Sequence, residues 1–136
     1  MRPITQFAEY AISAVVLLAE EGAQRQTAHQ IAARIGAPAS CLLVSLRELV
    51  RHGIVSSKRG RHGGFELVRS PDTLSILDIL EATKSPCERI TSCPLGLQEH
   101  GQQLCRLHRR LDDVVGEVEH MLAKTTIADL LTEPNR

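Results

Sequence analysis

The chain has 136 residues, enough for one compact domain, with 43% hydrophobic residues and no net charge. Two Phe and one Tyr are the only aromatic residues, so the core must be aliphatic and rich in alanine, which favours helices over a β-sandwich. No apolar run approaches the roughly 20 residues that a membrane span needs. The acidic residues that soon follow Met1 do not fit a signal peptide, so we expect a cytoplasmic protein without a membrane partner.

The first third of the chain predicts three helices. Apolar spacing predicts the first over residues 6–20. Thr27 and Gln30 form a capping box that opens a second, short helix over 28–35. A third helix is predicted over 38–52. The short second and third helices, joined by a tight turn, have the proportions of a helix-turn-helix.

A basic hairpin is predicted directly after these helices. Residues 54–58 and 65–68 have the composition of β-strands, and the loop between them, 59–64, reads Arg-Gly-Arg-His-Gly-Gly. Between Arg47 and Arg69 there are six basic residues and two acidic ones. A flexible cationic hairpin after a helix-turn-helix is typical of a wing, and such a surface favours an anionic partner.

The remaining chain predicts one long helix after an irregular segment. A short helix is expected over 74–83, and residues 84–102 contain glycine and proline without periodicity. Apolar residues then recur at a period of 3.6 over 104–122, followed by a last helical turn over 127–131. Since so small a domain leaves the long helix little to pack against, we expect it to pair with a second copy of the chain.

Three of the four cysteines are close together in sequence. Cys87, Cys93 and Cys105 fall within 19 residues, whereas Cys41 lies apart on the third helix, where we expect a structural role. In a reducing compartment, thiolates more often bind metal or sense redox state than form a disulfide scaffold. Iron binds thiolates strongly, so the three cysteines predict an iron site that lacks one ligand.

Several motifs together resemble one family of regulators. These are Leu46-Arg-Glu-Leu49, Arg59-Gly60-x-x-Gly63-Gly64-Phe65-x-Leu67 and the closing Thr125-Thr-Ile-Ala-Asp-Leu130. They are similar to the IscR/NsrR-type winged-helix regulators, which include the iron–sulfur assembly regulator and the nitric-oxide-sensing repressor. The resemblance covers residues 1–131. It implies a homodimer whose long C-terminal helices cross, with a cluster held in the loop before that helix.

The predicted DNA contacts lie on the recognition helix and the wing. They are Ser40, Leu43, Arg47 and Arg51 on the helix, and Lys58, Arg59, Arg61 and His62 on the wing. Leu43 stands where some relatives of that family carry a polar, base-reading side chain, so we expect a different operator sequence. An apolar side chain there can contact a thymine methyl group or pack internally.

The predicted cluster ligands are Cys87, Cys93, Cys105 and, from the partner subunit, Glu9. The resemblance implies the carboxylate, and His108 is the alternative fourth ligand. The spacing departs from the commoner family pattern, because Glu99 stands where a third cysteine is expected. The cluster is therefore predicted as either [2Fe–2S] or [4Fe–4S].

The predicted fold class is mainly α: a winged helix-turn-helix with a two-stranded β wing and a long C-terminal dimerisation helix. Residues 1–83 are expected to bind DNA, 84–102 to hold the cluster, and 103–136 to form the dimerisation helix and tail. The predicted function is a transcriptional repressor that binds an operator as a homodimer under control of the cluster. No nucleophile–base pair or phosphate loop suggests an enzyme. Two alternatives stay open: a structural zinc site at Cys87, Cys93, Cys105 and His108, or a thiol switch.

Overall fold

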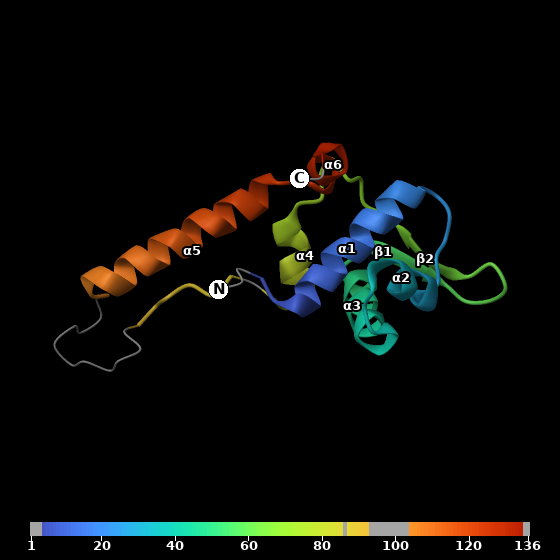
Figure 1. Ribbon diagram of the computed structural model, residues 1–136, viewed down its shortest axis with the longest axis horizontal. Helices are drawn as coiled ribbons and strands as arrows, with labels where there is room; N and C mark the ends of the chain where they lie inside the picture. Colours follow the sequence, from blue (N-terminus) through green and yellow to red (C-terminus); the bar gives the residue numbers. More distant parts are fainter. Residues whose placement is uncertain (1–3, 86, 93–103, 135–136) are drawn as a thin grey trace.

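The computed structural model describes residues 4–85, 87–92 and 104–134 and confirms the predicted fold class (Figure 1). Two short helices and a hairpin follow a first helix, and a long helix extends away from this body. The elements are α1 (Gln6–Glu21), α2 (Ala28–Ile35), α3 (Ala39–Arg51), β1 (Val55–Lys58), β2 (Gly64–Leu67), α4 (Ile76–Ala82), α5 (Arg106–Lys124) and α6 (Ile127–Thr132).

Local capping sets the bounds of the helix-turn-helix. The capping box is present: the Gln30 amide N–H donates to the Thr27 hydroxyl at 3.2 Å, and the Gln30 side-chain oxygen accepts from the Thr27 N–H at 2.8 Å. Gly36 ends α2 with φ of 72°, a conformation that favours glycine. Both signals are readable from sequence, and they place the turn between α2 and α3.

The core forms where α1 packs on α3. Ala11, Ala14 and Leu18 of α1 are fully buried, as are Leu42, Leu46 and Leu49 of α3. Alanines on the buried face let the two helices approach closely, so the core needs no aromatic side chains. This packing leaves the opposite face of α3 exposed.

The wing is attached to the body at its base. β1 and β2 pair antiparallel, with Val55 opposite Leu67 and Lys58 opposite Gly64. Phe65 and Gln26 exchange two backbone hydrogen bonds of 2.7 and 3.0 Å, which tie β2 to the loop between α1 and α2. Gly64 has φ of 131°, and a Cβ there would lie 2.6 Å from the Gln26 carbonyl oxygen. Only glycine permits this close approach.

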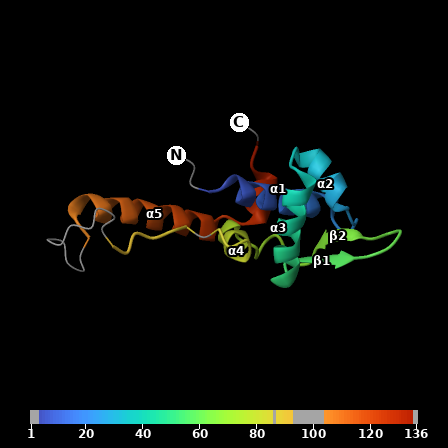
Figure 2. The same ribbon diagram turned by 90° about the horizontal axis from the view of Figure 1, so that it is seen from below.

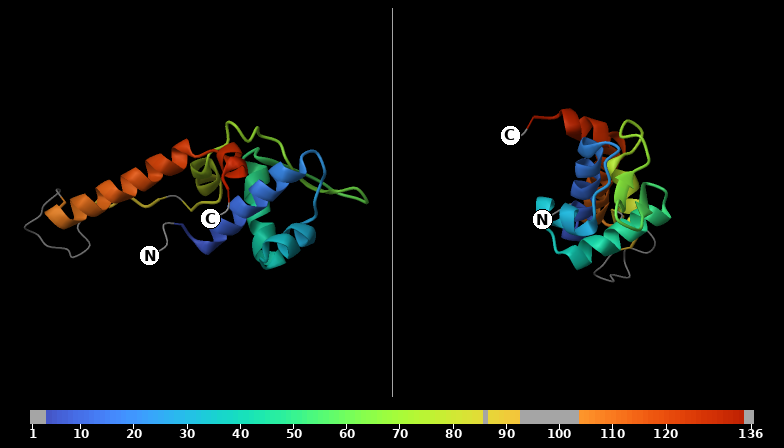
Figure 3. Two further views of the ribbon diagram at one scale, coloured as in Figure 1. Left: turned by 45° about the horizontal axis from the view of Figure 1, so that its top comes forward. Right: turned by 90° about the vertical axis from the view of Figure 1, so that its right-hand side faces the viewer.

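The last two helices behave differently from each other. α5 contacts α4 near Leu122 and projects from the body, while α6 lies beside α1 (Figures 1 and 3). The fully buried Ile127 of α6 belongs to the main core, and its N–H donates to the Leu74 carbonyl at 2.8 Å. The structure thus places α6 with the winged-helix body, although the sequence grouped it with the long helix.

Among the described residues, no helix is both long and apolar enough to cross a lipid bilayer.

Candidate functional site

One face of α3, the predicted recognition helix, is exposed to solvent. Ser40, Arg47 and Arg51 are exposed, and Leu43 is half-buried on the same side. At 100° per residue, these positions lie opposite the buried leucines of α3. Val44 lies within this surface and is 51% exposed. Val44 was not among the predicted contact residues, although its helical position next to Leu43 was a usable signal.

A basic groove runs between α3 and the wing. It has a volume of about 430 Å³. Five of the eight predicted DNA-contacting residues line it: Leu43, Arg47 and Arg51 from α3, and Lys58 and Arg59 from the wing. The groove is therefore cationic on both walls, with apolar Leu43, Val50 and Phe65 between them.

Most cations of this surface are not engaged in ion pairs with other described residues, in contrast to several arginines elsewhere in the body and the strap. Arg25, Arg34, Arg69 and Arg89 each form an ion pair with a carboxylate, and Arg51 pairs with Glu48 at 3.2 Å. Within the described part of the chain, Arg47, Lys58, Arg59 and Arg61 form no ion pair. An unpaired cation can bind a phosphate at a lower free-energy cost, because no internal ion pair has to break first.

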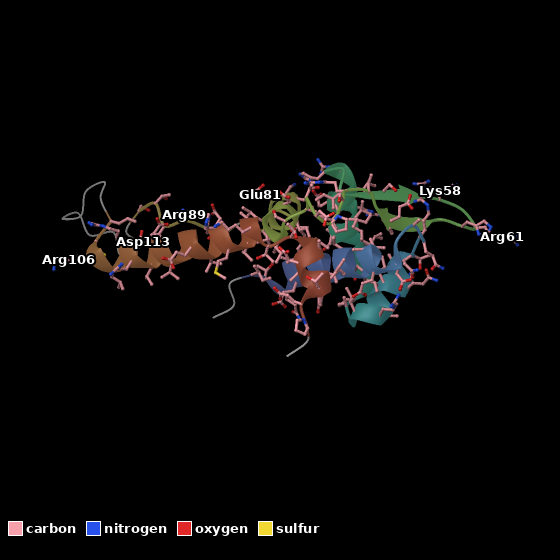
Figure 4. The ribbon with its side chains drawn as sticks, turned by 90° about the horizontal axis from the view of Figure 1, so that it is seen from above. Lys58, Arg61, Glu81, Arg89, Arg106 and Asp113 are labelled. Atoms are coloured by element: carbon pink, nitrogen blue, oxygen red, sulfur yellow. The ribbon has the colours of Figure 1, made fainter. Side chains whose placement is uncertain are left out.

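The wing tip faces a second, polar groove. Arg61 and His62 are exposed, and Figure 4 shows Lys58 and Arg61 extending along the hairpin at the end of the molecule opposite Arg106. The tip residues and the start of α2, including Thr27, line this groove of about 420 Å³. Ser40, in the first turn of α3, is the one predicted DNA contact that lines neither groove.

An ion pair at the wing base was not predicted. Arg25 Nη2 donates to Glu66 Oε1 at 2.6 Å, and both side chains are partly buried. The Ser56 hydroxyl donates to the same carboxylate oxygen at 3.4 Å. This contact joins the loop before α2 to both strands of the wing. Since 41 residues separate Arg25 from Glu66, no local pattern in the sequence indicates it.

A second ion pair holds the segment of residues 87–92, here called the strap, along the side of α5 (Figures 1 and 2). Arg89 donates through Nε and Nη2 to the two carboxylate oxygens of Asp112, each at 2.7 Å, and the Ile90 N–H donates to Asp112 at 2.9 Å. These hydrogen bonds, first that from Arg89, lower the pKa of Asp112 to about 2. A Cβ at Gly116 would lie 3.1 Å from the Arg89 guanidinium, so a small residue there accommodates the strap.

The strap places Cys87 at the body end of α5. Its side chain packs against the cluster of Ala8, Ile76 and Leu80. Burial, and next the negative charge of Glu119, raises the pKa of the Cys87 thiol. Ser85, two residues earlier, donates its N–H to the Leu80 carbonyl at 2.8 Å, which anchors this part of the chain to α4.

Cys105 lies at the other end of α5. It is the N-cap, its sulfur lies 3.5 Å from the His108 backbone nitrogen, and 3.0 Å separate Cys105 Sγ from His108 Nδ1. Glu119, which influences Cys87, follows Cys105 by fourteen residues, a helical rise of about 20 Å. The structure therefore brings Cys105 and His108 together but keeps Cys87 apart from both.

Of the two remaining predicted ligands, Cys93 and Glu9, the structure describes Glu9. Cys93 lies outside the described residues. Glu9 is half-buried on α1 next to Ala8, at the same end of α5 as Cys87. Cys41 is half-buried on α3. No three His, Cys, Asp or Glu side chains in the described ranges are grouped closely enough to hold a metal ion.

Comparison with known proteins decides the family. The sequence pattern that defines the Rrf2 family, described as an iron-dependent transcriptional regulator, matches residues 4–133. The chain belongs to the Rrf2 family. This membership confirms the predicted resemblance and assigns the chain to DNA-binding transcriptional regulators, a role that is not enzymatic.

Individual relatives agree with this assignment. An Rrf2-like HTH-type transcriptional regulator of Rhodobacter capsulatus is 28% identical over 141 residues, covering 97% of this chain and 94% of that protein. The structure of CymR, the global cysteine regulator of B. subtilis, matches with a TM-score of 0.80 at 21% identity, over 99% of this chain and 100% of that one. T. potens IscR matches with a TM-score of 0.73 at 22% identity, over 97% and 92%. At these identities, the two structures confirm the fold of this Rrf2-family regulator.

Proposed function

We propose that this Rrf2-family regulator binds an operator as a homodimer and that the cysteines around α5 control its affinity, with an iron–sulfur cluster as the sensing group. The single observation that carries the DNA-binding geometry is the groove between α3 and the wing, where Arg47, Lys58 and Arg59 form no ion pair with any other described residue. A helix in the major groove and a wing beside it would place these cations on the phosphate backbone.

The exposed face of α5 supports the homodimer. Leu107, Leu111, Val114, Val118 and Met121 follow a spacing of four and three residues, which is the a/d repeat of a coiled coil. Leu107 and Met121, at the two ends of this stripe, are 62% and 68% exposed. A stripe so exposed in one chain is covered when a second α5 packs against it.

The length of α5 also suits a dimer on DNA. Its 19 residues span about 28 Å. An antiparallel pair would carry one winged-helix body at each end, so the two recognition helices would be separated by more than the length of α5, which suits half-sites that lie one or more DNA turns of about 34 Å apart. This separation is what a palindromic operator requires.

The described conformation does not fit one cluster per chain. Cys87 and Cys105 lie at opposite ends of α5, and Ser85 anchors the chain two residues before Cys87, so Cys87 can move by only about 7 Å while that anchor holds. We infer that this is the cluster-free conformation. Joint ligation by Cys87, Cys93 and Cys105 would require the Arg89–Asp112 pair to open and the start of α5 to move.

The chemistry of the donor set favours iron. Thiolates are the usual ligands of iron–sulfur clusters, and a carboxylate or imidazole would complete the set more weakly. Glu9 of the partner subunit is the proposed fourth ligand, and His108, which already contacts Cys105, is the alternative. When bound, the group would supply sensitivity to iron, redox state or nitric oxide.

Two other chemistries, a structural zinc site and a thiol switch, use the same residues. The Cys105–His108 pair also suits tetrahedral zinc. A reversible disulfide would instead give a thiol switch; within one chain, the separation of Cys87 from Cys105 argues against bonding that pair in this conformation.

Anaerobic purification of the untagged chain, with iron, sulfide and zinc analysis, separates the three chemistries. A brown protein with stoichiometric iron and sulfide supports the proposal. Stoichiometric zinc in a colourless protein contradicts it. A metal-free protein whose DNA binding responds to peroxide and reductant, but not to iron, also contradicts it and favours the thiol switch.

A further inference from the structure

The recognition helix carries an exposed apolar side chain that packing does not explain. Among the large apolar residues of 4–85, only Val44 and Val68 are exposed, and Val44 alone lies on a helix of the helix-turn-helix. Valine is also a poorer helix former than alanine, leucine or glutamine. Val44 therefore contributes neither to the core nor to the stability of α3.

The position of Val44 is central to the surface that faces DNA. At 100° per residue, it lies within about 60° of Ser40, Arg47 and Arg51. These three exposed residues surround it, and the buried leucines lie on the opposite face. Val44 also falls in the N-terminal half of α3, the part of a recognition helix that contacts base edges.

The neighbouring Leu43 has a different environment. It is half-buried and lines the groove beside Phe65 and Val50. Leu43 therefore supports the wall of the groove, while Val44 is left free. Arg47, one turn later, supplies a charge suited to a phosphate or a guanine next to the same position.

The chemistry of the major groove identifies the feature that Val44 can read. Every base edge there offers hydrogen-bond donors or acceptors, which an isopropyl group cannot satisfy, and burying them unpaired is unfavourable. Thymine alone also presents an apolar group, its C5-methyl, beside its O4 acceptor. Resting on the proposed DNA-binding mode, we propose that Val44 is a specificity-determining residue that reads a thymine methyl group in each operator half-site.

The test removes that methyl group and nothing else. Operators are first selected from random duplex DNA with the full-length wild-type chain, and each thymine is then replaced singly by deoxyuridine. Wild-type affinity should fall about fourfold at one thymine in each half-site, the effect of one buried methyl group, or about 0.8 kcal/mol at 1.4 kcal/mol per tenfold. Val44→Ala should bind the thymine and uracil operators equally at that position. Alanine favours helix, so the variant is expected to fold.

Two variants complete the experiment. Val68→Ala removes the other exposed large apolar side chain of residues 4–85 and should keep the full thymine preference. Val44→Gln, selected on the same random pool, should shift the preferred base at this position from thymine to adenine, which glutamine recognises with two hydrogen bonds.

The outcomes separate the inference from the proposed function. If wild-type protein selects an operator but binds thymine and uracil equally everywhere, the inference is wrong and DNA binding stands. If Val44→Ala keeps the preference and Leu43→Ala loses it, Leu43 reads the methyl group and the assignment to Val44 is overturned. If wild-type protein enriches no sequence, the proposed function and the inference fail together.

Discussion

The winged-helix body and the α5 arm are stabilised in opposite ways. In the body, apolar side chains from α1, α3, the wing, α4 and α6 form a common buried core. Along α5, His108 is the one buried residue, and four of the five side chains of the apolar stripe are exposed. The body can therefore fold around its own core, whereas the arm needs a second surface. If two chains pair through α5, the orientation of the two winged-helix bodies relative to each other can change without any change in the structure of either body.

The largest expected effect comes from placing a charge in the arm. Val114→Glu should abolish the dimer, because it would bury an ion in an apolar seam. Since Val114 is exposed in one chain, the body should stay folded. Loss of the second half-site should weaken operator binding by about 100-fold or more. Sedimentation and gel-shift assays measure the two effects.

The matched control for this variant is His120→Glu, which adds the same charge at an exposed position outside the stripe. It should leave the dimer intact. A dimeric, operator-binding Val114→Glu protein would show that the stripe is not the interface.

A smaller effect is expected at the wing. Arg59→Ala and Arg61→Ala should each weaken operator binding by about five- to tenfold and lower the slope of log affinity against log salt by roughly one unit. Both side chains are exposed and unpaired within the described residues, so dimerisation and folding should not change. Arg34→Ala is the control, because that side chain pairs with Glu21 on the body. Unchanged affinity in both wing variants would remove the wing from DNA binding.

The three predicted cluster cysteines should control the cluster and operator affinity, with little effect on the stability of the fold. Cys87→Ala, Cys93→Ala and Cys105→Ala should each abolish the cluster chromophore and shift operator affinity in one common direction by about tenfold, or 1.4 kcal/mol. Glu9→Ala should leave a labile cluster with an altered spectrum. Cys41→Ala, on the recognition helix, should change neither property. Absorption spectra and gel shifts test this, and an unchanged chromophore in Cys105→Ala would contradict the ligand set.

The smallest effect concerns the strap. Arg89 lowers the pKa of Asp112 to about 2, so their contact is fully formed above the ordinary aspartate pKa near 3.8 and is lost as pH falls through about 2. Asp112→Asn should release the strap at neutral pH and expose Cys87 to thiol reagents. An NMR titration of the Asp112 carboxyl group measures the pH midpoint of its protonation, which is its pKa. A midpoint at the ordinary value, or unchanged Cys87 reactivity in the variant, would argue against the strap.

Features that depend on local sequence were predictable. The capping box at Thr27, the glycine stop at Gly36 and the basic hairpin over 59–64 all lie where the pattern placed them. The long helix begins at Arg106, two residues later than predicted, because Cys105 serves as its N-cap. Each of these features is determined within a few neighbouring residues.

Features that join distant parts of the chain were not predictable. The return of Ile127 to the core, the Arg25–Glu66 pair and the contact of Arg89 with Asp112 each depend on residues more than 20 positions apart. For the same reason, cysteine spacing indicated a shared site for Cys87 and Cys105, but it carried no signal that the strap holds them at opposite ends of α5.

Control of operator affinity by the cysteine-bound group is the central claim. Its most direct test is a gel shift under anaerobic conditions, with the cluster-loaded and the metal-free forms of the same protein measured on one selected operator at one salt concentration. The two affinities should differ by about tenfold, and Cys105→Ala should bind like the metal-free form. Equal affinities of the loaded and metal-free forms would contradict the claim.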